Sequence, residues 1–240
     1  PGGRGVGVES QWGATASCVA WGRKPYYADA APATFLSSRK TEKSLLREAA
    51  WWASASPLSS GIPALRPTTT RRSEETQALQ QFSTPIPLGL AAVCAAAISS
   101  SDRVLEPSAV TGLHAILAEI SGGSLVLNEL AEMRAGLLSN LFPTLSVTRF
   151  DAAQIDDHLD PASLPTVVLM NPPFSVLANV HGRVADAAYR HVASALGRLA
   201  DGGRLVTITG AGFGLEMSAW RDAFLRLQEQ GHVVFSATIS

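Results

Sequence analysis

Cysteine is scarce in this sequence of 240 residues, where only Cys18 and Cys94 are present. They lie far apart, and neither has a His or Cys neighbour at the spacing of metal ligands. A small secreted domain would carry paired cysteines, and a zinc site would carry clustered ones. The sequence indicates neither class, so we expect reduced thiols, no metal centre and a cytoplasmic location.

Long hydrophobic runs are also lacking. The longest strongly apolar run extends from Ile86 to Ile98, which is shorter than the roughly 20 residues that a membrane-spanning helix needs. The first residues are rich in glycine and contain no apolar segment of the kind found in secretory signals. We therefore expect no membrane partner. The chain begins with Pro1 rather than Met, which suggests a piece of a longer polypeptide.

Lysine is confined to the beginning of the chain, at Lys24, Lys40 and Lys43. Residues 1–72 hold ten Lys and Arg against four Asp and Glu, a net charge of +6, whereas residues 73–240 hold nine against sixteen, a net charge of −7. Cations that neutralise phosphates supply much of the affinity for nucleic acids. Residues 73–240 alone are therefore predicted to bind polynucleotides poorly.

The same boundary separates two kinds of sequence. Residues 1 to about 40 are rich in Gly, Ala, Ser and Pro and show no sustained period, which predicts a flexible segment. A short helix is expected over residues 41–55, followed by a proline-containing linker up to residue 72. We therefore expect a flexible basic N-terminal extension with a short helix over 1–72 and a folded domain over 73–240.

Within the folded domain, apolar strand-like segments alternate with helical ones. After two helices, one from residue 73 and an alanine-rich one from about residue 87 to 98, the expected strands cover 103–106, 125–128, 145–149, 166–170, 204–209 and 233–239. The expected helices between them cover 111–120, 131–140, 184–200 and 218–230. This alternation predicts an α/β fold with a doubly wound parallel sheet, which binds ligands at the carboxyl ends of its strands.

One strand end stands out because the apolar segment 166–170 is followed by Asn171, Pro172, Pro173 and Phe174. The two prolines end the strand, fix φ twice and remove two backbone donors. An amide oxygen and a free main-chain carbonyl can together accept both protons of an exocyclic amine, while an aromatic ring stacks on the flat group that carries it. The alternative is a Pro-Pro turn that only leaves the strand, with Phe174 in the core.

Acidic side chains follow the three preceding strands. Glu106 opens a turn of small residues that reaches Gly112, and its charge suits a ligand ammonium better than a pyrophosphate. Glu129 follows the second strand, where an acid typically binds ribose hydroxyls. Asp151 follows the third strand, where a carboxylate can accept from a purine amine. Each acid taken singly could instead cap a helix, but three in succession favour a binding site.

The motifs together resemble a known family. Gln81 to Pro85 reads Gln-Phe-Ser-Thr-Pro, and Glu-Pro-Ser-Ala-Val-Thr-Gly, Asn-Glu-Leu, Phe-Asp-Ala and Asn-Pro-Pro-Phe follow in order. This set is similar to the amino-methyltransferases of the N6-adenine type, and in particular to methylase domains joined to strawberry-notch-like helicases. The resemblance covers about residues 75–240. It implies a seven-stranded Rossmann-like methyltransferase that uses S-adenosylmethionine and acts on DNA, helped by a helicase domain or the basic extension.

The resemblance also implies roles for single residues. Asn171 and the Pro172 carbonyl would hold the target amine, and Phe174 would stack on the flipped base. Glu106 would face the amino group of the cofactor, Glu129 its ribose, and Asp151 its adenine amine, with Phe150 or Ala152 beside the ring. The full set of implied cofactor-binding residues is Phe82, Ser83, Thr84, Pro85, Glu106, Ser108, Gly112, Asn128, Glu129, Asp151 and Ala152.

Two departures from the family pattern bear on these expectations. Val110 stands where the family has glycine, and a β-branched residue is strained if the turn needs a positive φ. The family's last strand, which inserts between the fifth and sixth, has no counterpart after Ser240 and so is expected to be missing. Two alternatives therefore stay open, namely methylation of an RNA base or a protein glutamine, and a degenerate module without catalysis that accompanies a helicase.

Overall fold

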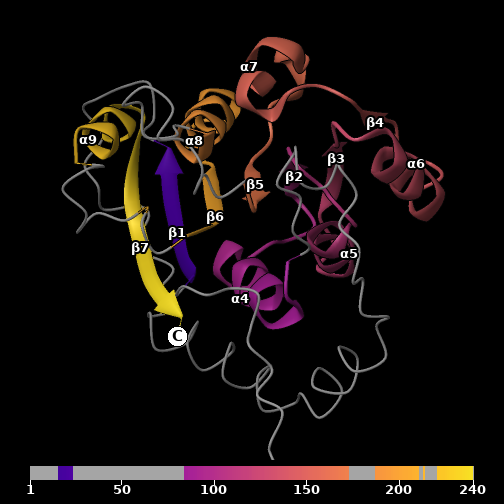
Figure 1. The fold of residues 1–240 in the computed structure, drawn as a ribbon, viewed down its shortest axis with the longest axis horizontal. Helices are drawn as coiled ribbons and strands as arrows, with labels where there is room; N and C mark the ends of the chain where they lie inside the picture. The colour runs from indigo at the N-terminus through magenta and orange to yellow at the C-terminus, as the bar shows by residue number, and fades with distance from the viewer. Residues whose placement is uncertain (1–15, 24–83, 173–186, 211–212, 214–220, 240) are drawn as a thin grey trace, which may run out of the picture.

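A seven-stranded sheet forms the centre of the fold (Figure 1), in the order β4-β3-β2-β5-β6-β1-β7. The computed structural model describes residues 16–23, 84–172, 187–210, 213 and 221–239. Five neighbouring strands pair in parallel. They are β2 (Arg103–Glu106), β3 (Ser124–Asn128), β4 (Val147–Thr148), β5 (Val167–Met170) and β6 (Arg204–Gly210). The predicted α/β class and parallel sheet are confirmed, with strand bounds within a few residues of those expected.

The first strand, β1 (Ala16–Arg23), lies within the segment of residues 1 to about 40 that was expected to be flexible, and it corrects that expectation for residues 16–23. It pairs antiparallel with β6 on one side and with β7 (Gly231–Ile239) on the other. The register runs from Ala16 opposite Gly210 and Ile239 to Gly22 opposite Arg204, with an irregularity against β7 at Ala20. The sheet therefore takes a strand from before residue 72. The predicted helices over 41–55 and from residue 73 lie outside the described residues.

The place of β1 also corrects the expectation of a missing strand. After β1 the strands are, in chain order, β2 to β7, so the fifth and sixth of them are β6 and β7. The family's last strand would be expected between these two. That position is occupied by β1, which comes from the opposite end of the sequence. The position that was expected to lack a strand is therefore filled by a strand from the amino-terminal part of the chain.

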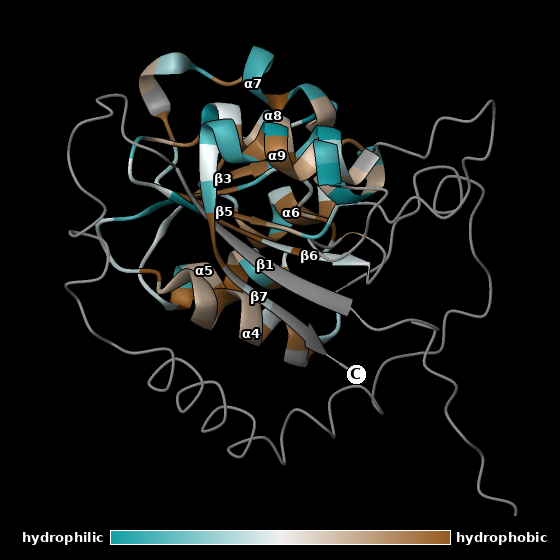
Figure 2. Ribbon diagram, turned by 90° about the vertical axis from the view of Figure 1, so that its left-hand side faces the viewer, coloured by the Kyte–Doolittle hydropathy of each residue, from teal (hydrophilic) through white to brown (hydrophobic). Residues whose placement is uncertain are grey.

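Helices cover both faces of the sheet (Figure 2). On one face lie α4 (Ile86–Ala96) and α5 (Leu113–Ile120), and on the other α7 (Ile155–His158), α8 (Ala187–Arg198) and α9 (Arg221–Gln230). Helix α6 (Glu132–Leu141) packs beside β4. Two short 3-10 helices, η1 (Ala152–Gln154) and η2 (Pro161–Ser163), flank α7. This layering is expected for apolar strands that alternate with amphipathic helices.

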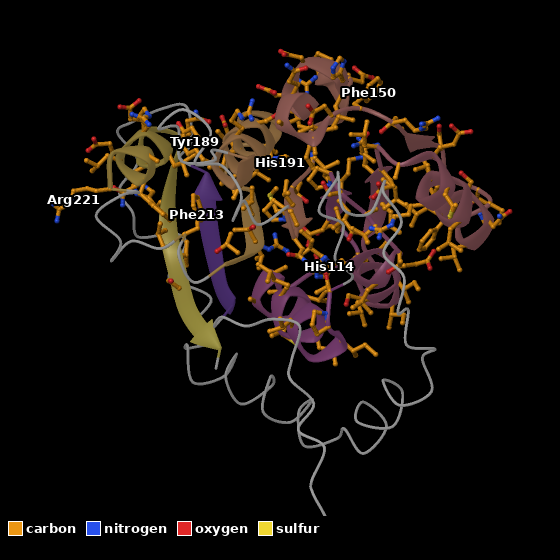
Figure 3. All side chains as sticks on the ribbon, in the orientation of Figure 1. His114, Phe150, Tyr189, His191, Phe213 and Arg221 are labelled. Atoms are coloured by element: carbon orange, nitrogen blue, oxygen red, sulfur yellow. The ribbon has the colours of Figure 1, made fainter. Side chains whose placement is uncertain are left out.

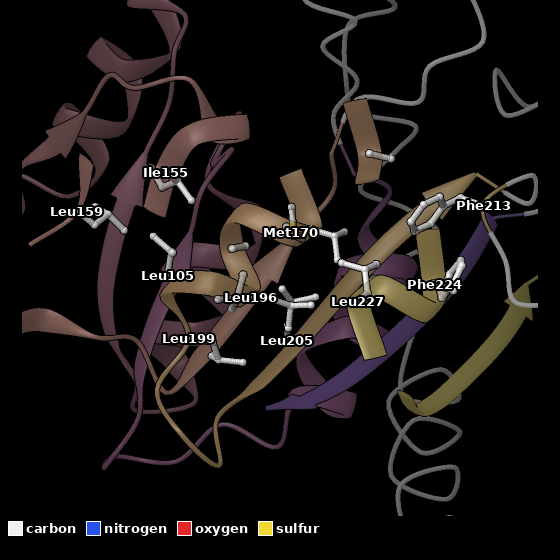
Figure 4. Packing of buried hydrophobic residues seen from close by; sticks show 14 residues of the cluster. Leu105, Ile155, Leu159, Met170, Leu196, Leu199, Leu205, Phe213, Phe224 and Leu227 are labelled. Carbon is white, nitrogen blue, oxygen red and sulfur yellow. The ribbon is translucent and has the colours of Figure 1, made fainter. Parts of the chain in front are cut away.

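Successive residues of each central strand point to opposite faces, so the sheet has a hydrophobic core on each face. Leu105, Val168, Met170 and Leu205 pack with residues of α8 and α9, including Leu196 and Leu227 (Figure 4). Val104, Val167, Leu169 and Val206 pack on the other face against Ala92 and Ala96 of α4. The alanines give α4 a smooth surface that lies close to the sheet. Strands buried on both faces account for the uninterrupted apolar runs seen in the sequence.

A partly buried ion pair ties the amino ends of the strands together. Asp102, just before β2, accepts hydrogen bonds from Arg204 of β6 at 2.7 and 3.1 Å. Its carboxylate also accepts from the Ser99 N–H and hydroxyl and from the Thr166 hydroxyl. Arg204 donates further to the carbonyls of Ala96 and Ala97 at the end of α4. These contacts lie at the edge opposite to the predicted site and fix the strands that carry it.

Candidate functional site

The predicted site residues that the structure describes lie at or just beyond the carboxyl ends of β2 to β5. Glu106 and Asn128 end β2 and β3, while Glu129 and Asn171 directly follow β3 and β5. Asp151 comes after the short β4 and precedes η1. Parallel strands bring these ends to one edge of the sheet, as the sequence analysis predicts. Phe82, Ser83 and Phe174 lie outside the described residues, so their predicted roles stay predictions.

The turn between β2 and α5 is tied to the end of β3 by main-chain donors. The Ala109 N–H donates to the Asn128 carbonyl at 2.9 Å, and the Val110 N–H donates to Glu129 Oε2 at 2.8 Å. The Gly112 N–H closes the turn on the Ala109 carbonyl at 2.7 Å. Ser108 is half-buried at the beginning of this turn. The turn is therefore rigidly placed at the strand ends.

Two residues of this turn have positive φ. Gly112 has φ of 80°, and a Cβ added there would lie 3.0 Å from Leu138 Cδ2, so glycine meets both a conformational and a packing requirement. Val110 has φ of 51°, a conformation that is strained for a β-branched residue. The sequence analysis singles out Val110 on the condition that the turn needs a positive φ, and the structure meets that condition.

Asn128 is fully buried, and its amide links the ends of three strands. Its Nδ2 donates to the carbonyls of Pro107 and Phe150 at 2.8 and 2.9 Å. Its Oδ1 accepts from the Thr148 hydroxyl at 2.8 Å and from the Phe150 N–H at 2.9 Å. Both donors and both lone pairs are therefore used inside the protein. The Asn128 side chain therefore holds the strand ends in place, and the expected contribution of Asn128 to a cofactor pocket stays a prediction.

Glu129 and Asp151 both have structural partners. Glu129 is buried and accepts the N–H groups of Val110 and Ala131, one on each oxygen. Asp151 is exposed, and one of its oxygens accepts the Ala153 N–H at 2.9 Å, which caps η1. The capping role that the sequence leaves open is thus present. A carboxylate has about four lone-pair sites, so binding of ribose by Glu129 and of an adenine amine by Asp151 stay predictions.

The surroundings of Asp151 are partly apolar. Ala152 is buried at the beginning of η1. Phe150, labelled in Figure 3, is half-buried and stacks on His158 of α7, with ring centroids 4.4 Å apart and planes tilted by 10°. One face of the Phe150 ring is therefore occupied by His158. Phe150 and Ala152, the two residues expected beside the adenine ring of the cofactor, therefore each already have a fixed place in the protein.

Asn171 and Thr84 meet at the end of β5. The Asn171 Nδ2 donates to Thr84 Oγ1 at 3.0 Å. Thr84 precedes α4, the helix that covers this face of the sheet, and Pro85 lies at the amino end of α4. Asn171 Oδ1 is buried and has no hydrogen-bond partner among the described residues. Pro172 is buried beside it. The structure thus brings together Thr84 and Asn171, which the sequence analysis assigned to cofactor and target.

Glu106 has a partner that the sequence analysis did not single out. His114, the second residue of α5 and labelled in Figure 3, lies with its Nδ1 3.2 Å from Glu106 Oε1. Both side chains are buried, and Glu106 Oε2 and His114 Nε2 have no hydrogen-bond partner among the described residues. Burial raises the pKa of Glu106, although the contact with His114 acts in the opposite direction. The signal in the sequence that could have indicated this partner is a histidine that follows shortly after a strand with an acidic last residue.

The described residues carry no sign of a metal site or of a membrane span. They contain no group of three or more His, Cys, Asp or Glu side chains that could hold a metal ion. Cys94 is half-buried and is not part of a disulfide within the described part of the chain. None of the described helices is long and apolar enough to cross a bilayer.

No protein-family model matches the sequence, and no curated protein matches it. Solved structures do match the chain. A putative RNA methyltransferase from Pyrococcus horikoshii is 17% identical with a TM-score of 0.50, covering 71% of this chain and 76% of that one. The modification subunit of a putative type I restriction enzyme from Vibrio vulnificus is 15% identical with a TM-score of 0.50, covering 61% and 38%. TrmN from Thermus thermophilus is 23% identical with a TM-score of 0.45, covering 59% and 44%.

These likenesses concern the fold. At such identities, the shared architecture shows that the chain has a Rossmann-like methyltransferase fold. The chain spans less than half the length of TrmN and of the restriction-enzyme subunit. The activity and substrates of those proteins are therefore not transferred to it by the comparison alone.

Proposed function

We propose that this chain is an S-adenosylmethionine-dependent methyltransferase domain that methylates an exocyclic amine, and that its substrate is the N6 amine of adenine in DNA. The fold and the positions of Asn171, Glu106, Glu129 and Asp151 support the reaction class. The Asn-Pro-Pro-Phe motif and the shared fold of a restriction-enzyme modification subunit support the DNA substrate. An RNA methyltransferase has this fold too, so RNA belongs in the same test.

The observation that carries this proposal is the buried Asn171 Oδ1. A buried acceptor without a partner is costly in a folded protein. Its amide nitrogen is held by Thr84 at 3.0 Å, which directs the oxygen away from that contact. An amine of the substrate would supply the missing hydrogen bond. Asn171 follows β5, is buried and has a fixed orientation. All three properties are expected of a group that binds a target amine.

The reaction needs little acid–base chemistry from the chain. The cofactor, when bound, supplies an electrophilic methyl group. Asn171 Oδ1 and the Pro172 carbonyl would accept the two protons of the target amine and orient its lone pair. Most of the rate enhancement then comes from positioning and from preorganised acceptors. The buried site of Asn171 excludes water, which would otherwise compete for these acceptors.

The described residues fit the cofactor. Glu106 offers a buried Oε2, unpaired among the residues that the structure describes, for the ammonium group of the methionine part. Glu129 and the exposed Asp151 lie at the next two strand ends, where they would bind the ribose and the adenine amine. Because residues 73–240 carry a net charge of −7, we propose that the basic residues before position 73 or a helicase domain contribute affinity for DNA.

The test is Asn171→Ala, assayed for cofactor binding and for methyl transfer. We expect tritiated methyl incorporation into adenine-containing DNA to be lost, while affinity for S-adenosylhomocysteine in calorimetry stays within a few-fold. Parallel assays with RNA and protein substrates identify the acceptor. The matched control is Asn140→Ala, an exposed residue of α6, which should behave as the wild type. Equal methyl transfer by Asn171→Ala would contradict the assignment.

A second candidate is a module that no longer catalyses methyl transfer. Val110 at φ of 51° favours it, because the turn that would approach the cofactor carries strain and a branched side chain. Binding of S-adenosylhomocysteine by the wild-type chain, without methylation of DNA, RNA or protein, would establish this candidate. Absence of any binding would exclude the cofactor role as well.

A further inference from the structure

Glu106 and His114 form a buried polar pair with two unused groups. The exposed fractions of the two residues are 4% and 2%, and Glu106 Oε2 and His114 Nε2 have no partner among the described residues. Unpaired polar atoms are rare in protein interiors, so each one needs a physical explanation. A ligand that completes the pair on the Glu106 side is one explanation, and the surroundings of Glu106 favour it.

Glu106 and Asn171 lie on the same face of neighbouring strands. In the register of β2 and β5, Val104 is opposite Val167 and Leu105 opposite Val168. Because side chains alternate between faces, Glu106 and Asn171 both fall on the face of Val104 and Val167, which α4 covers. Each presents a buried oxygen that has no hydrogen-bond partner within the described part of the chain. Two unpaired acceptors therefore lie at the same edge and on the same face.

Helix α4 closes over this region from the side. A Cβ added at Gly89 would lie 2.8 Å from Leu113 Cδ2 and 3.5 Å from His114 Cδ2, so the α4 backbone lies close to the imidazole. Thr84, just before α4, already contacts Asn171. The imidazole is thus held between α4 and the end of β2, with one ring nitrogen directed at Glu106.

The charges around the pair favour a cationic ligand. The titratable groups at this point are Glu106 from β2, His114 from α5 and Glu129 after β3, whose charge acts to raise the pKa of Glu106. Thr84 and Asn171 carry no charge, and Cys94 near the far end of α4 is the only titratable side chain of that helix. An ammonium would be attracted by both carboxylates.

Resting on the proposed function, we propose that His114 is a positioning residue for the cofactor. In the neutral tautomer with its proton on Nδ1, it donates to Glu106 Oε1 and fixes the carboxylate, so that Oε2 accepts from the ammonium of the methionine part. Without the imidazole the carboxylate would lose its side-chain donor and would be held only by the backbone hydrogen bond from Ala115. The residue acts through Glu106 and does not itself touch the methyl group.

The experiment compares two ligands that differ in the amino-acid part. S-adenosylhomocysteine carries the ammonium, whereas 5′-methylthioadenosine lacks the whole amino-acid portion. By calorimetry, His114→Phe should weaken S-adenosylhomocysteine about tenfold, the effect of losing one charge-assisted hydrogen bond. Affinity for methylthioadenosine should stay within about twofold, because adenine and ribose are bound elsewhere. His114→Asn, which can place an amide donor near the position of Nδ1, should restore most of the loss.

The pH profile gives a second readout. Because the contact with His114 lowers the pKa of Glu106, the phenylalanine variant should lose S-adenosylhomocysteine at a higher pH than the wild type as the solution is acidified. Equal weakening of both ligands would mean a purely structural role and would overturn the inference, as would unchanged affinity in His114→Phe. A wild-type chain that binds neither ligand would overturn the proposed function, and this inference with it.

Discussion

Thr84 and Asn171 are 87 positions apart in the chain, yet the Asn171 amide donates a hydrogen bond to the Thr84 hydroxyl at 3.0 Å. The contact joins the segment before α4 to the end of β5. Asn171 is buried, and within the described ranges its nitrogen is paired while its oxygen has no partner. The segment assigned to the cofactor and the residue assigned to the target amine are therefore coupled directly, without an intervening side chain.

This coupling predicts a catalytic effect for a residue outside the Asn-Pro-Pro-Phe motif. Thr84→Val keeps the shape of the side chain but removes the acceptor, so the buried Asn171 nitrogen is left unpaired and the amide can rotate. We expect kcat for methyl transfer to fall about tenfold, which corresponds to one lost buried hydrogen bond. Thr84→Ser, which retains the hydroxyl, should keep most of the activity. A valine variant with wild-type kcat would show that the contact does not orient Asn171.

Val110 gives a prediction about strain in the cofactor turn. Since its φ is 51°, Val110→Gly should relieve about 1 kcal/mol of backbone strain, reduced somewhat by the greater entropy of glycine in the unfolded chain. We expect a higher unfolding temperature and about tenfold tighter binding of S-adenosylhomocysteine, measured by calorimetry. Val110→Ala removes the methyl groups but keeps a Cβ at positive φ. If alanine tightens binding as much as glycine, side-chain bulk and not backbone strain is the cause.

The parallel part of the sheet could be predicted because its signals are local. Strands such as β5 are short apolar runs ended by prolines, and the helices between them begin and end near polar residues. Strand β1 was missed for the opposite reason. Its sequence, ASCVAWGR, has only a four-residue apolar run within a segment rich in Gly, Ala and Ser, and its partners β6 and β7 follow about 190 and 215 residues later. Only tertiary pairing makes it a strand.

The site was predictable to a similar extent. The positions of Glu106, Glu129, Asp151 and Asn171 at neighbouring strand ends could be predicted because the fold class brings these ends together, whereas their roles stay predictions. The structural role of Asn128 could not be predicted, since only the structure shows that Pro107, Thr148 and Phe150 saturate its amide. His114 was missed because a lone histidine within an apolar helix is usually a core residue. Its importance depends on a contact with Glu106 that forms only when α5 packs beside β2.

Asp102 predicts how stability depends on pH. Burial acts to raise its pKa, but hydrogen bonds from Arg204, Ser99 and Thr166 outweigh burial and hold the pKa well below its usual range. A carboxyl whose pKa is lowered by folding stabilises the protein above its unfolded value, near pH 4, and this contribution is lost as the pH falls further. We expect Asp102→Asn to cost about 2 kcal/mol at pH 7 and less below pH 3, measured by urea unfolding.

The control for this ion pair is Glu119→Gln, an exposed residue of α5 without a buried partner. It should change the free energy of unfolding at pH 7 by no more than about 0.5 kcal/mol. An Asp102→Asn variant whose deficit is the same at pH 3 and pH 7 would show that the amide disrupts packing, and that the charge of Asp102 is not what stabilises the strand ends.

The position of β1 predicts that residues 73–240 do not form a stable domain by themselves. Removing β1 leaves β7 without its strand partner and turns β6 into an edge. We expect a chain truncated before residue 73 to lose cooperative thermal unfolding and to aggregate through the exposed edges. A chain lacking only residues 1–14 retains β1 and should unfold as the full chain does, with the transition followed by circular dichroism.

The register offers a rescue that separates the strand from the rest of the removed segment. Ala16 lies opposite Ile239 in an antiparallel pair, so the end of β7 is next to the beginning of β1. Joining Ile239 to Ala16 through a two-residue Asn-Gly turn would form a hairpin, the connection that such geometry favours. A chain of residues 73–239, the turn and residues 16–23 should therefore regain cooperative unfolding. If it does not, or if the truncated chain folds without β1, then β1 is not what completes the sheet between β6 and β7.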